Sequence, residues 1–129
     1  MIFDEATVGQ FIYDLLTTNI GSNVYFNLAD RDATFPYAVF NLLDAFQQEG
    51  NNTNFMLEID IWHNRGNQIT DLLALQKSIQ QFLHKRTCRN SDLSLFFNLE
   101  STLNLDVTQE EQLRRRQLRF NVRYYNNDI

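Results

Sequence analysis

The chain has 129 residues, 43% of them hydrophobic and 21% charged, and a formal net charge of −5. This length and composition fit one globular domain over residues 1–129 with a single core. They exclude a membrane-spanning protein, because no run of about 18 apolar residues is present. The N-terminus lacks the basic and apolar segments of a secretory signal, so synthesis in the cytosol is expected. The single cysteine excludes a fold that depends on an internal disulfide.

The first part of the chain predicts a helix, a short strand and a loop. Apolar side chains recur at helical spacing over residues 4–18, and Asp4 suits the positive end of the helix dipole. Residues 19–21 end this helix. Residues 24–26 are a candidate short strand. Residues 27–34 are too polar and irregular to pack, so we expect a loop there.

Two strands with a polar connection come next. Residues 37–46 carry apolar pairs that blur the alternation, as in a strand partly covered on both faces, and Pro36 suits the start or edge of such a strand. Residues 55–62 alternate, with one apolar and one largely acidic face. The connection at residues 47–54 is longer than most hairpin loops. Contact with another molecule and simple flexibility both explain this length.

A second helix follows the alternating strand. Apolar side chains fall at helical spacing over residues 67–86, Asn67 is a candidate N-cap, and Lys85 and Arg86 lie near the expected C-terminal carbonyls. The apolar stripe of this helix matches the apolar face of the preceding strand. Because each buried Leu, Ile or Phe contributes about 1.5–3 kcal/mol, we expect this packing to form the core.

The last third of the chain predicts a turn at residues 87–92 and two further strands. Residues 93–107 alternate for longer than most strands, so both a single bent strand and a hairpin reversing near residue 100 fit the pattern. A charged turn at residues 108–112 leads to a last strand at residues 113–125. Together the elements predict an α+β fold, with one mostly antiparallel β-sheet and two main helices packed on it.

The sequence offers only weak signals for catalysis or metal binding. His84 and Cys88 stand four residues apart, a spacing that suits zinc on a helix, but a tetrahedral site needs four ligands and His63 is the only further histidine. Glu58 and Asp60 lie about 7 Å apart on one strand face, as paired catalytic carboxylates could. A solvated or ion-paired sheet face explains them more simply. We therefore predict no catalytic residues, metal, cofactor or enzymatic activity.

Charge is distributed unevenly along the chain. Residues 1–60 carry nine acids and one base, a net charge of −8, whereas residues 61–129 carry seven acids and ten bases, a net charge of +3. Either the two halves interleave in one sheet and compensate each other, or acidic and basic surfaces of neighbouring copies meet. The overall acidity disfavours free nucleic-acid binding.

Three arginines share the polar face of the last strand, about 13–14 Å apart. We expect them to face acidic residues of the same sheet or of a neighbouring subunit, and not DNA. The predicted subunit or partner interface comprises Arg115, Arg119, Arg123, Glu58, Asp60, Trp62, Arg31, Asp32, Gln48, Glu49 and Asn52.

The order of these elements resembles that of the tail-terminator, or tail-to-head joining (tail completion), proteins of long-tailed bacteriophages. The resemblance covers nearly the whole chain and rests on four features: the N-terminal helix, the Phe-Pro-Tyr strand entry at residues 35–37, the strand and helix of residues 57–83, and the last strand around residues 114–120. Its motifs are patterns of elements, and they carry no catalytic residues.

The resemblance implies a structural virion protein in the neck region of the tail, assembled in the host cytoplasm. Such proteins form a ring, usually hexameric, that caps the tail tube and joins it to the head connector or stopper protein. DNA would pass through the ring without specific binding. The alternative is a non-enzymatic module that binds nucleic acid or protein through the arginine-bearing face of the last strand.

Overall fold

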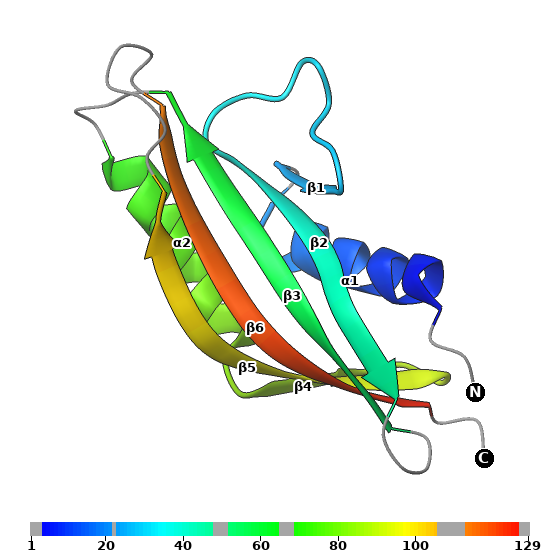
Figure 1. The fold of residues 1–129 in the computed structure, drawn as a ribbon. Helices are drawn as coiled ribbons and strands as arrows, with labels where there is room; N and C mark the ends of the chain where they lie inside the picture. The colour runs from blue at the N-terminus through cyan, green and yellow to red at the C-terminus, as the bar shows by residue number, and fades with distance from the viewer. Residues whose placement is uncertain (1–3, 22, 48–51, 65–68, 106–112, 127–129) are drawn as a thin grey trace.

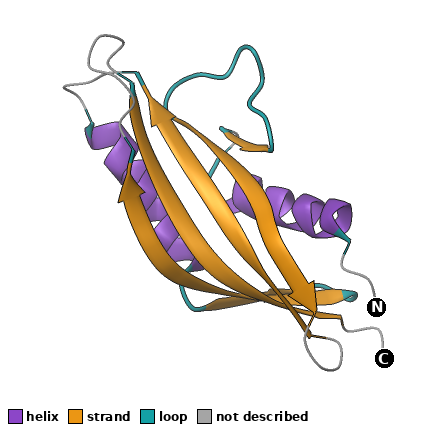
Figure 2. Cartoon of the chain, viewed as in Figure 1, coloured by secondary structure: helices purple, strands orange, loops and turns teal. Residues whose placement is uncertain are grey.

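The computed structural model describes residues 4–21, 23–47, 52–64, 69–105 and 113–126 (Figure 1). A six-stranded sheet, in the order β1-β2-β3-β6-β5-β4, is its main layer. Both helices lie on one face of the sheet, and no described helix covers the other face (Figures 1 and 2). In chain order the elements are α1 (Glu5–Asn19), β1 (Val24–Phe26), β2 (Tyr37–Gln47), β3 (Asn52–His63), α2 (Thr70–Leu83), β4 (Arg86–Arg89), β5 (Leu93–Asn104) and β6 (Arg114–Asn126).

The sheet is mixed and curled, so the predicted fold class, a mostly antiparallel sheet, was wrong. β1 runs parallel to β2, with Val24 opposite Ala38 and Phe26 opposite Phe40, whereas the other neighbouring strands are antiparallel. The parallel pair arises because the loop after β1 carries the chain back to the end of the sheet at which β1 began. Sequence periodicity assigns faces to a strand but does not give the direction of its neighbour.

The first helix, predicted over residues 4–18, spans Glu5–Asn19, and Asp4 is its N-cap. The Asp4 carboxylate accepts hydrogen bonds from the backbone N–H groups of Ala6 (3.1 Å) and Thr7 (3.3 Å) and from the Thr7 hydroxyl (2.7 Å). These bonds, that of the Thr7 side chain above all, lower the pKa of the Asp4 carboxyl. The inward-facing side chains are buried, namely Val8, Ile12 and Leu16. Capping and packing together therefore hold α1.

The second helix is shorter than predicted. It begins after Ile69, which has no side-chain capping bond, and the proposed cap, Asn67, lies outside the described residues. Its C-terminal end fits the prediction better, because the Arg86 guanidinium donates to the Phe82 carbonyl and lies 4.4 Å from the centroid of the Phe82 ring. Neither described helix is long and apolar enough to cross a membrane.

The core lies between the helices and the sheet, as predicted. The inward faces of the two central strands, β3 and β6, are almost fully buried and meet the buried stripe of α2. The core residues from these three elements are Phe55, Leu57, Ile59 and Ile61 of β3, Leu118, Phe120, Val122 and Tyr124 of β6, and Leu72, Ile79 and Leu83 of α2. The apolar alternation of the sequence thus corresponds to the face that the helices cover.

Several strand boundaries differ from the prediction. β2 extends to Gln47 and β3 begins at Asn52, so the predicted eight-residue loop at 47–54 was wrong, and residues 48–51 lie outside the described residues. Part of the predicted turn at 87–92 is instead the strand β4. β5 is one strand with a register shift between Leu99 and Ser101, which selects the bent strand over the hairpin. The predicted turn at 108–112 lies outside the described residues.

Candidate interaction surface on the open face of the sheet

The sheet face away from the helices, here called the open face, carries the polar side chains of β3 and β6. Because residues directly opposite each other in an antiparallel pair share a face, the register decides which of them meet. Glu58 lies opposite Arg119, and Trp62 lies opposite Arg115. The predicted acids and two of the predicted arginines therefore lie on adjacent strands of one subunit.

Asp60 is the centre of a hydrogen-bonded network on this face. Arg115 contacts one carboxylate oxygen, Oδ1 of Asp60, through both Nε and Nη2 at 3.0 Å. Gln117 Nε2 donates to the same oxygen, also at 3.0 Å. The Arg115 guanidinium lies 5.1 Å from the centroid of the Trp62 ring, within the range of a cation–π contact. Arg115 is thus held by a carboxylate and an aromatic ring of its own chain.

Arg119 and Arg123 are held less tightly. Arg119 Nε donates to Gln117 Oε1 at 3.0 Å and lies 3.5 Å from Glu58 Oε2, and 45% of its side chain is exposed, against 28% for Arg115. Arg123 is exposed, and its described contact is with the Tyr125 hydroxyl at 3.5 Å. Because exposed ion pairs stabilise by only about 0–1 kcal/mol, these two guanidinium groups can be drawn to another partner at low cost.

The other predicted interface residues lie elsewhere. Arg31 and Asp32 are exposed in the loop between β1 and β2. Asn52 begins β3, opposite Tyr125. The predicted contacts Gln48 and Glu49 lie outside the described residues. The predicted interface residues of β3 and β6 therefore lie together on the open face, whereas Arg31 and Asp32 lie in a separate loop.

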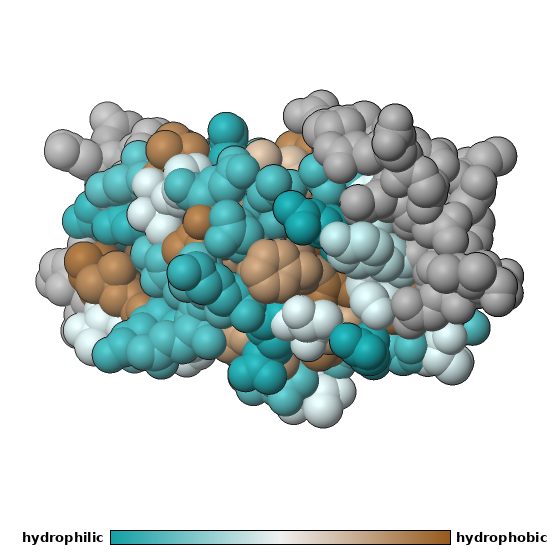
Figure 3. Space-filling model, turned by 90° about the horizontal axis from the view of Figure 1, so that it is seen from below, coloured by the Kyte–Doolittle hydropathy of each residue, from teal (hydrophilic) through white to brown (hydrophobic). Residues whose placement is uncertain are grey.

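An aromatic cluster at one end of the sheet was missed as a candidate site. The Tyr37 ring is 6.2 Å from that of Tyr25 and 5.1 Å from that of Phe35 between centroids, and Tyr37 lies opposite Trp62. The only signal in the sequence was the Phe-Pro-Tyr strand entry. Viewed from below, the surface of the molecule is mostly hydrophilic with separate hydrophobic patches (Figure 3). Partly exposed aromatic side chains near arginine are typical of protein–protein contacts.

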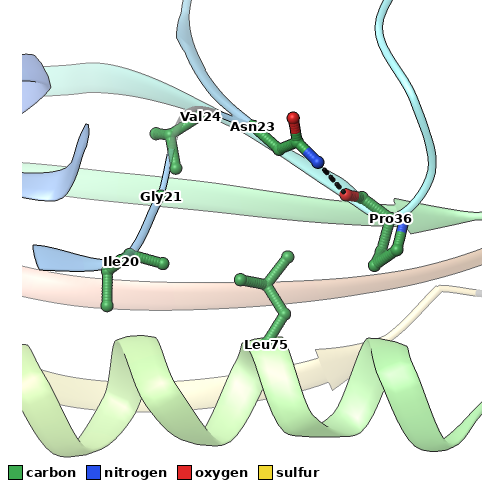
Figure 4. Close-up of a pocket in the computed structure, with 6 residues that line it drawn as sticks. All are labelled: Ile20, Gly21, Asn23, Val24, Pro36 and Leu75. Atoms are coloured by element: carbon green, nitrogen blue, oxygen red, sulfur yellow. Dashed lines mark hydrogen bonds between the residues drawn. The ribbon is translucent and has the colours of Figure 1, made fainter.

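A cavity of about 330 Å³ lies where the end of α1, β1 and α2 meet (Figure 4). Leu75 points into it from α2, toward Ile20 and Pro36, and Asn23 Nδ2 donates to the Pro36 carbonyl at 3.4 Å. None of the described lining residues is titratable. The described part of the lining therefore offers packing surface.

The two histidines and the cysteine considered for zinc binding are hydrogen-bonded or at least partly buried. In the described parts of the chain, no group of three or more His, Cys, Asp and Glu side chains could hold a metal ion. His84 Nδ1 accepts the Leu99 backbone N–H at 3.1 Å. Burial raises the pKa of the Cys88 thiol, although Arg86 opposes the shift, so the thiol is less reactive. His63 is buried, and neither of its ring nitrogens has a hydrogen-bond partner among the described residues.

Comparison with known proteins identifies the fold. No family model matches the chain, and no curated protein sequence matches it. A solved chain from the virion of a native gene transfer agent particle is similar, with a TM-score of 0.67 and 16% identity over 86% of this chain and 84% of that chain. A second solved structure aligns with a TM-score of 0.59 and 7% identity over 94% of this chain and 91% of the other. At these identities the likeness shows the fold alone.

Proposed function

We propose that this chain is a structural protein of a bacteriophage or phage-like virion. The observation that carries the proposal is the fold shared with a chain of a gene transfer agent virion, which extends over 86% of one chain and 84% of the other. The likeness therefore extends over most of the chain and is not confined to one common motif. An open sheet face with exposed arginines and nearby aromatic rings supports a role in assembly.

The finer proposal is a tail terminator. Copies of the chain would form a ring, hexameric in the family that the sequence resembles, which caps the tail tube and contacts the head connector or stopper protein. DNA would pass through the ring without specific binding. The order of the elements along the chain supports this role. A ring also requires two different surfaces on each subunit, and the open face and α1 lie on opposite sides of the sheet (Figure 1).

The alternative is a module that binds nucleic acid or protein through the arginine face. One contact disfavours the nucleic-acid version. Asp60 already engages Arg115 at 3.0 Å, so a phosphate at Arg115 would have to displace a carboxylate of the same chain. A structural role uses this face without breaking the Asp60 network.

The proposal is tested on particles produced with and without this chain. A stop codon early in its gene is expected to leave filled heads and unattached tails in negative-stain electron micrographs, and wild-type protein supplied in trans should restore joined particles. Complete joined particles in the absence of the chain would overturn the tail-terminator proposal.

Immunogold labelling of an epitope-tagged chain in complete particles separates the two levels of the proposal. Label at the junction of head and tail supports the terminator. Label elsewhere on the particle would overturn the terminator and leave the virion protein in place. Absence of the chain from purified particles would overturn both.

A further inference from the structure

The exposed side of α1 forms a ridge between two grooves. Its outward side chains include Thr7, Gln10 and Asp14, and Gln10 Nε2 donates to Asp14 Oδ1 at 2.9 Å. One groove, of about 290 Å³, lies between α1 and the start of the loop after β1. The other, of about 420 Å³, lies between α1 and the turn after β4. Gln10 lines both grooves, which places the ridge between them.

Each groove combines aromatic side chains with one carboxylate. The first is lined by Tyr13 and Phe26 together with Asp30. The second is lined by Phe11 together with Asp14. A guanidinium group fits such a lining, because its plane stacks on aromatic rings while its N–H groups pair with a carboxylate. An ammonium group would lose the stacking, so arginine is favoured over lysine.

Two arginines on the open face of the same chain are separated by about the width of a helix. Arg119 and Arg123 stand four residues apart on β6, which corresponds to about 13–14 Å. An α-helix with its side chains is about 10–12 Å across. The two guanidinium groups can therefore lie on either side of a helix laid across the strand, with Asn121 beneath the helix.

We propose that α1 of one copy docks across the open face of a second copy, with Arg119 and Arg123 of that second copy entering the two grooves beside α1. The occupant of the open face is thus a second copy of this chain. The inference rests on the proposed ring, because it names the contact between neighbouring subunits.

Charge complementarity selects this occupant. The described stretch of residues 4–19 carries Asp4, Glu5 and Asp14 and no lysine or arginine, whereas the open faces of β3 and β6 carry three arginines against Glu58 and Asp60. The two surfaces lie on opposite sides of the subunit, since α1 is behind the sheet in the view that shows the open face (Figure 1). Such a contact is head-to-tail, and head-to-tail contacts produce rings when the rotation closes.

Disulfide trapping tests the contact directly in the purified full-length protein. In a Cys88→Ser background, Gln10→Cys is placed on the ridge and Asn121→Cys on the open face. At high protein concentration and low salt, the chain that carries both cysteines is expected to give a ladder of cross-linked oligomers on non-reducing gels. A mixture of the two single-cysteine chains should stop at one cross-linked heterodimer.

Two controls make the result specific. Leu73→Cys, at an exposed position of α2, combined with Asn121→Cys should give no ladder. Adding Asp14→Arg and Asp30→Arg, or Arg119→Asp and Arg123→Asp, should abolish the ladder while circular dichroism shows a folded chain. A groove-reversed chain that carries Asn121→Cys, mixed with an arginine-reversed chain that carries Gln10→Cys, should still give the heterodimer, because one intact contact remains.

Absence of the ladder, or a ladder unchanged by the charge reversals, would overturn the inference. A tail terminator that contacts its neighbours through other surfaces would then remain, as judged by particle joining. Conversely, a ladder from a chain that particles do not need for joining would support the contact and refute the terminator. The two proposals therefore fail separately.

Discussion

Gly9 shows at the scale of one residue why α1 can lie so close to the sheet. A side-chain carbon at this position would overlap the Phe26 ring, which is itself stacked on Phe40 with 4.9 Å between ring centroids. Gly→Ala in an ordinary helix interior stabilises by about 1 kcal/mol. Here we expect Gly9→Ala to destabilise by about 1–3 kcal/mol, because the added carbon displaces the Phe26 ring from its stack on Phe40. Urea unfolding measures the change.

A second substitution tests the cause of that effect. In a Phe26→Leu background, which removes part of the ring, Gly9→Ala should cost less than it does in the wild type. Equal costs in the two backgrounds would show that the helix position, and not the aromatic contact, sets the requirement for glycine.

Asp4 predicts an acid-dependent loss of stability. Its folded-state pKa is lowered chiefly by the Thr7 hydroxyl, so the stabilisation is present above the unfolded pKa near 3.8 and is lost as the pH falls through the lower folded pKa. Asp4→Asn keeps a capping oxygen and removes this titration. We expect thermal melts to show a smaller drop on acidification below pH 5 for Asp4→Asn than for wild type. Identical pH profiles would refute the role of the carboxylate.

At the scale of elements, the sequence predicts which face of a helix or strand is buried better than it predicts which strands lie next to each other. Alternation over β3 and helical spacing over α2 gave the correct buried sides, because burial imposes a period on the sequence. β4 escaped prediction because its Arg-Thr-Cys-Arg sequence has no apolar face to alternate. The start of β3 was read as loop because Asn52 and Thr53 are polar, although Thr53 is buried. The backbone pairing of these residues with β6 does not depend on their side chains, so the sequence does not indicate it.

Packing of α2 on the central strands predicts large costs for truncation. Ile59 and Leu72 are fully buried, and removing such side chains typically costs about 2–5 kcal/mol, much of the stability of a small domain. Ile59→Ala and Leu72→Ala should therefore lower the melting temperature strongly or cause precipitation. Leu73→Ala is the matched control, because the Leu73 side chain on the same helix is exposed. Similar melting of all three variants would contradict this core.

At the scale of the whole molecule, the uneven charge along the chain has two outcomes in space. Part of it is compensated within the subunit, since the acids of β3 meet the arginines of β6. The rest is not, because α1 and its cap remain acidic, while Arg123 is exposed and Arg119 is held only loosely by Glu58. From the sequence we expected charges to be compensated either within one subunit or between neighbouring copies. Which residues pair in which way could not be predicted, because strand register decides which residues meet. The grooves beside α1 were also beyond prediction, since they are formed by segments distant in sequence.

This distribution of charge predicts weak binding to DNA. Arg115 is held by Asp60 at 3.0 Å, and the chain carries a net charge of −5, so few phosphates would be neutralised and few counterions of DNA released on contact. Binding that depends on phosphate contacts also falls steeply with salt. We expect fluorescence anisotropy with a labelled duplex to show no saturable binding at physiological salt. Asp60→Asn is the informative variant, because it removes the negative charge that Arg115 contacts and should raise DNA affinity at low salt. Tight wild-type binding that Arg119→Ala and Arg123→Ala abolish would instead establish the nucleic-acid-binding module.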